Sequence, residues 1–376
     1  MKIVRKIFNS IQEDLKNNRN IIILYGARQT GKTTLSNDVL SGTSESVLKI
    51  NADEIKYADV LSSRDLDRMK LLVSGYDILF IDEAQRIPDI GINLKIIHDN
   101  WPSLKILATG SSSFDLANKV KEPLTGRTST HILYPISLSE LSVQVNAFEL
   151  QSKLEEYMIY GMYPVIFHHT SGHSKEKYLR ELTSAYLYKD VFELSSIKNN
   201  SKISSLLKLL ALQIGSETSV NELALNLKLS QETVASYIEL LEKAFIIFRL
   251  GGYSRNLRKE VSKRNKIYFW DLGVRNCLVE NFNSFNIRND VGALWENFII
   301  SERFKYLEYT QNFLSSYFWR TYTGAEIDYI EEKGGKLYAY EIKYKKARKI
   351  APKTWVEQYG DNYKSITRDN FWEFVI

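Results

Sequence analysis

The stretch YGARQTGKTTL, residues 25–35, determines the expected fold of the first third of the chain. It follows the apolar run IIIL (21–24) and precedes the helix-like TLSNDVL (34–40), so a strand, a glycine-rich turn and a helix are expected in succession. Residues 26–33 match the pattern GxxxxGK[ST] at every fixed position. In such a loop, backbone N–H groups point at phosphate oxygens and the following helix N-terminus adds positive partial charge. The stretch therefore predicts a loop that binds the phosphates of ATP.

Within this loop, Lys32 is expected to reach the β and γ phosphates, and the Thr33 hydroxyl to ligate Mg²⁺. The other expected nucleotide contacts are Gly26, Ala27, Arg28, Gln29, Thr30, Gly31 and Thr34. A glycine-rich turn that binds no nucleotide is the alternative.

A second element, YDILFIDEAQ (76–85), places Asp82 and Glu83 directly after an apolar, doubly buried strand. Both carboxylates then emerge at the carboxyl end of the sheet, where α/β folds bind ligands. Asp82 is expected to hold Mg²⁺ through water, and Glu83 to polarise the attacking water. Capping of the next helix is the alternative role for these two acids.

The strand-like LKILATG (104–110) runs into three serines, which predicts Ser111 beside the γ-phosphate. The segment LTGR (124–127) then places Arg127 before another apolar strand. An arginine there could stabilise charge on the transferring phosphoryl group, in this chain or in a neighbouring subunit of a homo-oligomer. A surface salt bridge is the alternative for Arg127.

Composition indicates a soluble protein of two or more domains, with 376 residues, 44% hydrophobic and 25% charged. The net charge of +5 is small, so any affinity for nucleic acid has to come from local basic patches. The single cysteine, Cys277, excludes an internal disulfide and fits a reducing compartment. No apolar segment approaches the length of a membrane span, and charges interrupt the amphipathic N-terminal segment. A cytoplasmic location without membrane contact is expected.

Five segments in order, GARQTGKTT (26–34), FIDEAQ (80–85), ATGSSS (108–113), LTGR and PISLSEL (135–141), carry a resemblance to a family. The chain resembles predicted bacterial and archaeal ATPases of the AAA+ superfamily, which pair the ATPase core with a C-terminal restriction-endonuclease-like domain of the PD-(D/E)xK type. The resemblance covers essentially the whole chain. Similar proteins carry a Gly-Gly-x-Pro element in the lid; here YGMYP (160–164) keeps Gly161 and Pro164, while Tyr160 replaces the first glycine.

The expected fold is α/β, with a parallel-sheet AAA+ P-loop core at residues 1–145 and a helical lid at 146–200. Residues 201–275 predict a winged helix-turn-helix, with three short helices, caps at Ser219 and Ser230, and two strands. Residues 285–376 are expected to form the α/β restriction-endonuclease-like domain.

The third helix of the predicted helix-turn-helix carries Glu232, Glu239 and Glu242, which phosphates would repel. The loop after it is basic and could instead follow a nucleic-acid backbone as a wing; its cationic residues are Arg255, Arg258, Lys259, Lys263, Arg264 and Lys266. A solvated loop without a ligand is the alternative.

The last ninety residues carry a second candidate site. A helix bearing Glu296 precedes AEIDYIEEK (325–333), a Gly-Gly turn and KLYAYEIKYKK (336–346), which together predict a hairpin that brings Asp328 toward Glu341. Glu341 and Lys343 are two residues apart and share a strand face. Asp328 and Glu341 could bind Mg²⁺, Lys343 could orient the attacking water, and Glu296 could complete the cluster. This arrangement resembles the nuclease superfamily, although Glu-x-Lys is also common on exposed strands.

These motifs leave three functions open. The first is an ATPase whose hydrolysis rearranges a C-terminal half that binds or cuts DNA or another nucleic acid. The second is a nucleotide-dependent switch that binds a protein partner through a catalytically inactive nuclease fold. The third, a small-molecule kinase, is disfavoured because the adjacent Asp82 and Glu83 are typical of water activation and no acceptor-site pattern is present.

Overall fold

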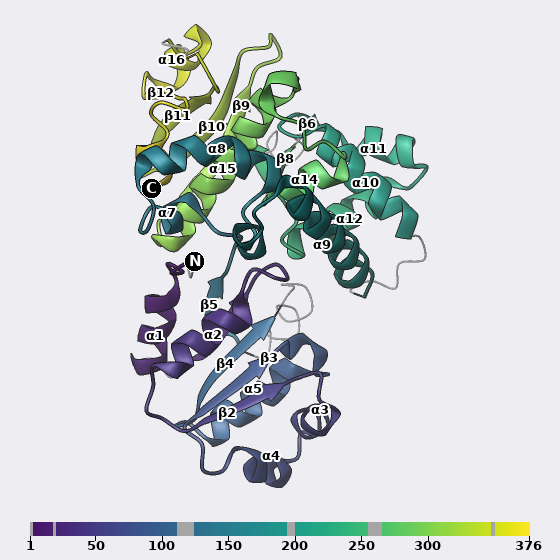
Figure 1. The fold of residues 1–376 in the computed structure, drawn as a ribbon, viewed down its shortest axis with the longest axis vertical. Helices are drawn as coiled ribbons and strands as arrows, with labels where there is room; N and C mark the ends of the chain where they lie inside the picture. The colour runs from purple at the N-terminus through teal and green to yellow at the C-terminus, as the bar shows by residue number, and fades with distance from the viewer. Residues whose placement is uncertain (1–2, 18–19, 111–123, 194–199, 255–264, 347–349) are drawn as a thin grey trace.

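The computed structural model describes residues 3–17, 20–110, 124–193, 200–254, 265–346 and 350–376. This part of the chain forms two lobes, each built on a β-sheet, and helices from the middle of the chain lie with the second lobe (Figure 1).

The first lobe is an α/β structure around a parallel sheet. Its strand order is β2-β3-β4-β1-β5, and every neighbouring pair is parallel. The strands are β1 (Ile21–Tyr25), β2 (Val47–Asn51), β3 (Ile78–Asp82), β4 (Lys105–Gly110) and β5 (Thr128–Ile132). The surrounding helices are α1 (Phe8–Asn17), α2 (Lys32–Ser41), α3 (Ile55–Ser62), α4 (Leu66–Val73) and α5 (Ile90–Asn100).

Apolar side chains cover both faces of this sheet. In β1, Ile22 and Leu24 pack with α1 and α2, whereas Ile21 and Ile23 pack on the other face with α5. This double burial explains why the strands are continuous apolar runs in the sequence. Because all five strands run in the same direction, the segments that follow β1, β3 and β4 lie together at the carboxyl ends of the strands.

The middle of the chain is mainly helical. Its helices are α7 (Leu138–Leu141), α8 (Ala147–Tyr160), α9 (Gly172–Glu193), α10 (Asn200–Leu212), α11 (Val220–Leu227) and α12 (Gln231–Lys243). Ser219 and Ser230 cap α11 and α12 by accepting backbone N–H bonds, as the sequence predicts. The short strand β6 (Glu217–Thr218) lies between α10 and α11 in the chain. The assignment of this region to a winged helix-turn-helix stays a prediction.

A seven-stranded sheet in the order β12-β11-β10-β9-β7-β8-β6 forms the second lobe. Its remaining strands are β7 (Ile247–Gly252), β8 (Asn265–Phe269), β9 (Ser315–Arg320), β10 (Glu326–Lys333), β11 (Lys336–Ile342) and β12 (Tyr363–Ile366). The helices are α14 (Leu272–Leu278), α15 (Val291–Tyr309), α16 (Lys353–Tyr359) and α17 (Trp372–Val375). Short 3₁₀ turns lie at Ala84–Arg86, Pro164–His168 and Phe285–Ile287.

One sheet thus extends across the expected boundary between residues 201–275 and residues 285–376. Gly251 and Gly252 in β7 pair in parallel with Tyr317 and Phe318 in β9. A single apolar core also runs from α8 through α10–α12 to α15 and α17. The domain limits expected at residues 275 and 285 stay predictions. The strands before and after these limits belong to one sheet.

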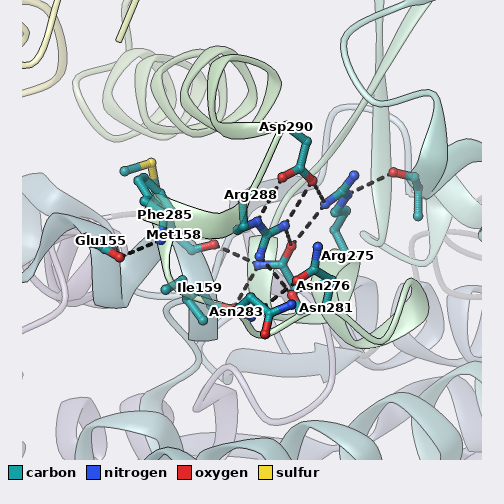
Figure 2. Close-up of polar contacts among 11 residues, drawn as sticks. Glu155, Met158, Ile159, Arg275, Asn276, Asn281, Asn283, Phe285, Arg288 and Asp290 are labelled. Atoms are coloured by element: carbon teal, nitrogen blue, oxygen red, sulfur yellow. Dashed lines mark hydrogen bonds and ion pairs between the residues drawn. The ribbon is translucent and has the colours of Figure 1, made fainter. Parts of the chain in front are cut away.

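A buried polar network joins α8 to α14 and to the start of α15 (Figure 2). The Asn276 amide donates to the carbonyls of Met158 and Ile159, both at 2.9 Å. The Asn276 oxygen accepts from Arg275 and Arg288, and both guanidinium groups pair with Asp290. Partial burial disfavours the charge on Asp290, but the two arginines lower its pKa to about 2.

The end of α8 also packs tightly on α14. Asp271 accepts from the backbone N–H groups of Met162 at 2.7 Å and Val274 at 3.1 Å. A Cβ on Gly273 would lie 2.2 Å from the Tyr160 carbonyl oxygen, and a Cβ on Gly161 would lie 2.1 Å from Asp271 Oδ1. These glycines allow the lid helix to approach α14 closely.

Among the described residues, no helix is both long enough and apolar enough to cross a membrane.

A matched pair of glycine substitutions tests the contact between α8 and α14. Gly273 and Gly292 are each the second residue of a helix, but a Cβ on Gly292 meets nothing within 4 Å. We expect Gly292→Ala to leave the unfolding free energy unchanged or to raise it by up to about 1 kcal/mol. We expect Gly273→Ala to lower it by about 1–3 kcal/mol, because the clash is with backbone atoms. Denaturant unfolding monitored by tryptophan fluorescence measures both, and equal effects would contradict the close contact.

Candidate functional site

The loop between β1 and α2 has the backbone shape that its glycines allow. Gly26 has φ +153° and Gly31 has φ +96°, conformations that side chains rarely adopt. A Cβ on Gly26 would also lie 2.2 Å from the Leu133 carbonyl oxygen. Both glycines of the sequence pattern are therefore required by the fold.

Lys32 begins α2 and folds back over this loop. Its side chain is buried, and Nζ donates to the carbonyl oxygens of Gly26 and Ala27, both at 2.9 Å. The Ala27 carbonyl also accepts from the Thr30 hydroxyl at 2.8 Å. The ammonium group is thus held at the loop that would receive phosphate.

Thr33 and Asp82 meet in space although they are far apart in the sequence. The Thr33 hydroxyl donates to Asp82 Oδ2 at 2.8 Å. Thr109, at the end of β4, donates to Asp82 Oδ1 at 2.5 Å and accepts from the Glu83 N–H at 3.1 Å. A hydroxyl oxygen beside a carboxylate is a donor set that suits Mg²⁺, so these residues fit the expected ion.

A cavity of about 670 Å³ lies over this loop, a volume typical of small-molecule sites. Residues 29–34 of the loop form one wall, and Glu83 reaches the same cavity. Ile3 and Arg5 line it from the N-terminal segment, while Pro164 and His168 line it from the segment after α8. The cavity therefore lies between the phosphate loop, the N-terminal segment and the segment that follows α8, which the sequence assigns to the predicted lid.

A hydrogen bond from the lid reaches the loop directly. The Tyr178 hydroxyl in α9 donates to Gln29 Oε1 at 2.8 Å. Burial and the nearby Asp271 carboxylate raise the pKa of Tyr178, which keeps the hydroxyl protonated. No local sequence motif marks the contact of Tyr178 with the loop.

Arg127 lies away from this cavity. It precedes β5, and its carbonyl accepts from the N–H of Ile21 at the start of β1, whereas the phosphate loop follows the end of β1. A five-residue strand spans about 16 Å, so Arg127 and the loop lie at opposite ends of the strands. Its guanidinium pairs with Asp99 at 3.0 Å. The structure does not bring Arg127 to the phosphate loop of its own chain and shows it in a salt bridge instead, so a role on the phosphoryl group stays a prediction.

Ser111 lies outside the described residues. Of the hydroxyl groups near the end of β4, Thr109 is the one seen in contact with Asp82 and Glu83.

The C-terminal residues Asp328, Glu341 and Lys343 converge, as the hairpin predicts. Lys343 Nζ lies 3.1 Å from Asp328 Oδ2 and 3.1 Å from Glu341 Oε1. Asp328 Oδ2 also accepts from the Ile342 N–H at 2.8 Å. Both carboxylates are buried, whereas the Lys343 side chain is 45% exposed.

Glu296 projects from α15 toward the same cluster, but its partners are on β8. It accepts from the Tyr268 hydroxyl at 2.6 Å and from Lys266 Nζ at 3.1 Å. Lys266 also pairs with Glu326 at 2.6 Å. Burial is the main influence on Glu296 and, with the nearby Asp328 charge, raises its pKa to about 7, although Lys266 acts in the opposite direction.

The position of Lys266 differs from the one expected in the basic wing. Lys266 was expected there, but it belongs to β8, is 2% exposed and neutralises two glutamates. The other five basic residues of that loop lie outside the described residues. In α12, Glu239 pairs with Lys243, and Glu242 pairs with Arg249 of β7, so two of its acids are compensated within the fold.

Metal binding at the C-terminal cluster is less well supported than at the nucleotide loop. In the described part of the chain, no group of three or more His, Cys, Asp or Glu side chains is placed so that it could hold a metal ion. Asp328 and Glu341 share the Lys343 ammonium, and Glu296 is held by Lys266. Mg²⁺ ligation by Asp328 and Glu341 stays a prediction.

The raised pKa of Glu296 predicts a pH dependence of stability. Between about pH 4.5 and the folded-state pKa of about 7, the folded protein keeps a proton that the unfolded chain has released, so stability falls as pH rises through this range. Glu296→Gln removes this loss. We expect the stability of the variant relative to wild type to rise across that range, by up to about 3 kcal/mol. Thermal melting at a series of pH values, with the exposed Glu357→Gln as control, measures the difference. Parallel curves for wild type and Glu296→Gln would contradict it.

The chain matches three family models: "AAA domain" over residues 18–142, and two domains of unknown function, DUF8612 over 151–284 and DUF4143 over 291–367. An uncharacterized protein of Mycobacterium tuberculosis is 29% identical over 327 residues, covering 86% of this chain and 70% of that protein. An uncharacterized protein of Methanocaldococcus jannaschii is 25% identical over 301 residues, covering 75% of this chain and 66% of that one.

A solved structure titled as a Walker-type ATPase of Pyrococcus abyssi is similar to this chain with a TM-score of 0.51 at 15% identity, covering 73% of this chain and 95% of that one. This likeness concerns the fold. The fold likeness and the AAA match both agree with the parallel sheet and the loop geometry. The restriction-endonuclease-like fold of the C-terminal region stays a prediction. The first lobe matches the AAA model and has the fold of a P-loop ATPase, a fold that supports nucleotide binding and hydrolysis.

Proposed function

We propose that this chain binds ATP with Mg²⁺ at the loop of residues 26–34, hydrolyses it, and transmits the nucleotide state to its C-terminal half. The observation that carries the proposal is the composition of the 670 Å³ cavity, whose walls come from the phosphate loop and from the lid together. A nucleotide in this cavity would contact both parts at once.

The described residues divide the chemistry among them. The backbone N–H groups of the loop would hold the phosphates, and Lys32 would exchange its carbonyl partners for phosphate oxygens. Thr33 and Asp82 would hold Mg²⁺, which supplies charge neutralisation on the phosphates when bound. Glu83, at the cavity wall, would orient water and accept its proton as the water attacks the γ-phosphorus and the bond to the β,γ-bridging oxygen breaks, which releases ADP and phosphate.

The route from nucleotide to C-terminal half starts at the lid. Tyr178 contacts the loop through Gln29, and Pro164 and His168 form part of the cavity wall. The same lid is fixed to α14 through Asp271 and Asn276. A change of lid position on ATP binding would therefore be passed to the second lobe instead of being absorbed in a linker.

The function of the C-terminal half is proposed as nucleic-acid binding or cleavage. The convergence of Asp328, Glu341 and Lys343 supports cleavage, because two carboxylates and an ammonium are the groups that metal-assisted phosphodiester hydrolysis uses. The internal pairing of these charges supports the second candidate, a nucleotide-dependent switch that binds a protein partner and cleaves nothing.

Two substitutions test the ATPase. Lys32→Ala removes the phosphate-binding ammonium, and Glu83→Gln removes the base while keeping a similar shape. We expect both to reduce kcat by about 10²–10³-fold, because each removes charge that acts on the transferring phosphoryl group or its water. Glu83→Gln should still bind ATP. Phosphate release measures kcat, nucleotide titration measures binding, and Lys70→Ala, on an exposed residue of α4, is the control. Wild-type turnover in Lys32→Ala would reject the proposal.

Cleavage is tested with DNA and RNA substrates in Mg²⁺ or Mn²⁺. We expect wild type to cleave and Asp328→Ala to lose about 10²-fold or more, since a ligand and hydrogen-bond acceptor is lost. Asp361→Ala, at an exposed position, is the matched control. No cleavage of any substrate by wild type, together with a partner complex trapped by Glu83→Gln, would favour the switch.

A further inference from the structure

Arg5, in the segment before α1, holds the phosphate loop from outside the sequence motif. Its side chain is buried, and its guanidinium donates in three directions. Nη1 donates to the Thr30 carbonyl at 2.7 Å, Nη2 to the Tyr134 carbonyl at 2.6 Å, and Nε to Glu140 Oε1 at 2.9 Å. Arg5 also lines the nucleotide cavity. It therefore contacts the site without being part of the loop.

The contact with Thr30 fixes the orientation of one peptide unit. In a planar trans peptide the C=O and the following N–H point in opposite directions. Holding the Thr30 carbonyl on Arg5 thus directs the Gly31 N–H to the other side of the unit. Gly31 has φ +96° and lines the cavity, so this N–H belongs to the group that would hold phosphate.

The acid that balances Arg5 belongs to another element. Glu140 is fully buried in α7, where it forms a capping box with Ser137 and accepts from the Lys6 N–H at 3.1 Å. Leu138, the first residue of α7, donates its N–H to Glu302 of α15 at 2.6 Å. The phosphate loop and α15 are thereby joined through one helical turn and three short buried contacts: Thr30 with Arg5, Arg5 with Glu140, and Leu138 with Glu302.

Glu302 in turn is paired within α15. Lys305 Nζ lies 2.7 Å from Glu302 Oε1 and donates to the carbonyl of Ile136, a residue that lines the nucleotide cavity. Both side chains are at most 2% exposed. Glu296 lies six residues earlier in the same helix, or about 9 Å along the axis. One helix therefore contacts the surroundings of both candidate sites.

We infer that Arg5 is a positioning residue for ATP binding, and that the junction formed by Arg5, Glu140, Glu302 and Lys305 couples the phosphate loop to α15 and the cluster around Glu296. This inference rests on the proposed ATPase activity. The junction contains two buried ion pairs, Arg5 with Glu140 and Lys305 with Glu302. The register of α7 on α15 is fixed by the Leu138 N–H bond to Glu302 and by the Lys305 bond to the Ile136 carbonyl, because shifting it would leave these buried groups without partners. Loss of one hydrogen bond at Thr30 releases the loop from this junction.

The kinetic test is the variant Arg5→Lys. Lysine keeps the positive charge, but it lacks the planar guanidinium with which Arg5 reaches three acceptors. We expect the KM for ATP to rise about tenfold, which corresponds to about 1.4 kcal/mol of lost binding, with kcat within about threefold of wild type. Arg64→Lys, at an exposed pair with Asp89, is the control and should stay within about twofold. A merely structural role would reduce the active fraction and kcat at an unchanged KM, and an unchanged KM overturns the inference.

Should Arg5→Lys fail to fold, Glu140→Gln replaces it, because the amide keeps an acceptor for the Ser137 N–H while removing the charge that orients Arg5. We again expect the KM for ATP to rise about tenfold, and an unchanged KM overturns the inference.

The coupling is tested by amide hydrogen exchange with and without a nonhydrolysable ATP analogue. In wild type we expect the analogue to change protection in the loop and in residues 291–309. In Arg5→Lys at saturating analogue, the change should remain in the loop and be lost in α15. An identical change in α15 in both proteins overturns the coupling. Wild-type turnover in Lys32→Ala would instead reject the ATPase itself, so the two failures are distinguishable.

Discussion

The arrangement of the two lobes depends on charged side chains that are buried and must therefore pair with one another. Taking an ion out of water is costly unless a partner replaces the solvent, and removing one partner leaves an uncompensated charge. Such pairs add little net stability, but they penalise every arrangement in which the partners are separated. Glu140 and Glu302 illustrate this, because each accepts hydrogen bonds from an element other than its own. Apolar and aromatic contacts, such as that of Tyr134 with Trp270, accompany these polar pairs at the interface between the lobes.

Much of the nucleotide site could be predicted because its chemistry is local in the sequence. Residues 26–33 are consecutive, and a parallel sheet brings Asp82 to the same edge by topology alone. The hairpin with Asp328 and Glu341 was predictable for the same reason, since a Gly-Gly turn fixes which strands are neighbours. Arg5 and Tyr178 were not, because their contacts with the loop span 25 and 149 residues and no pattern of spacing marks them. Lys266 was assigned to the basic loop because the sequence does not distinguish a basic residue at the end of a loop from one at the start of a buried strand.

The C-terminal cluster and the nucleotide loop differ in how their charges are arranged. At the loop, Lys32 contacts neutral carbonyl oxygens, partners that an anionic phosphate can displace. At the cluster, Lys343 and Lys266 contact carboxylates, which attract them more strongly than a carbonyl does. A ligand entering the cluster would have to separate ion pairs before it could bind. The loop could therefore accept a phosphate by exchanging hydrogen bonds, whereas a ligand of the cluster would first have to break ion pairs.

The parallel pairing of β7 with β9 has a practical consequence for anyone who divides this protein. A truncation that ends near residue 285 would remove the strand that pairs with Gly251 and Gly252 and leave that end of β7 without its neighbour. It would also expose apolar residues of the core shared by α10–α12 and α15 to solvent. Fragments cut at that position should aggregate through the open strand, even though the position lies between two matched family models.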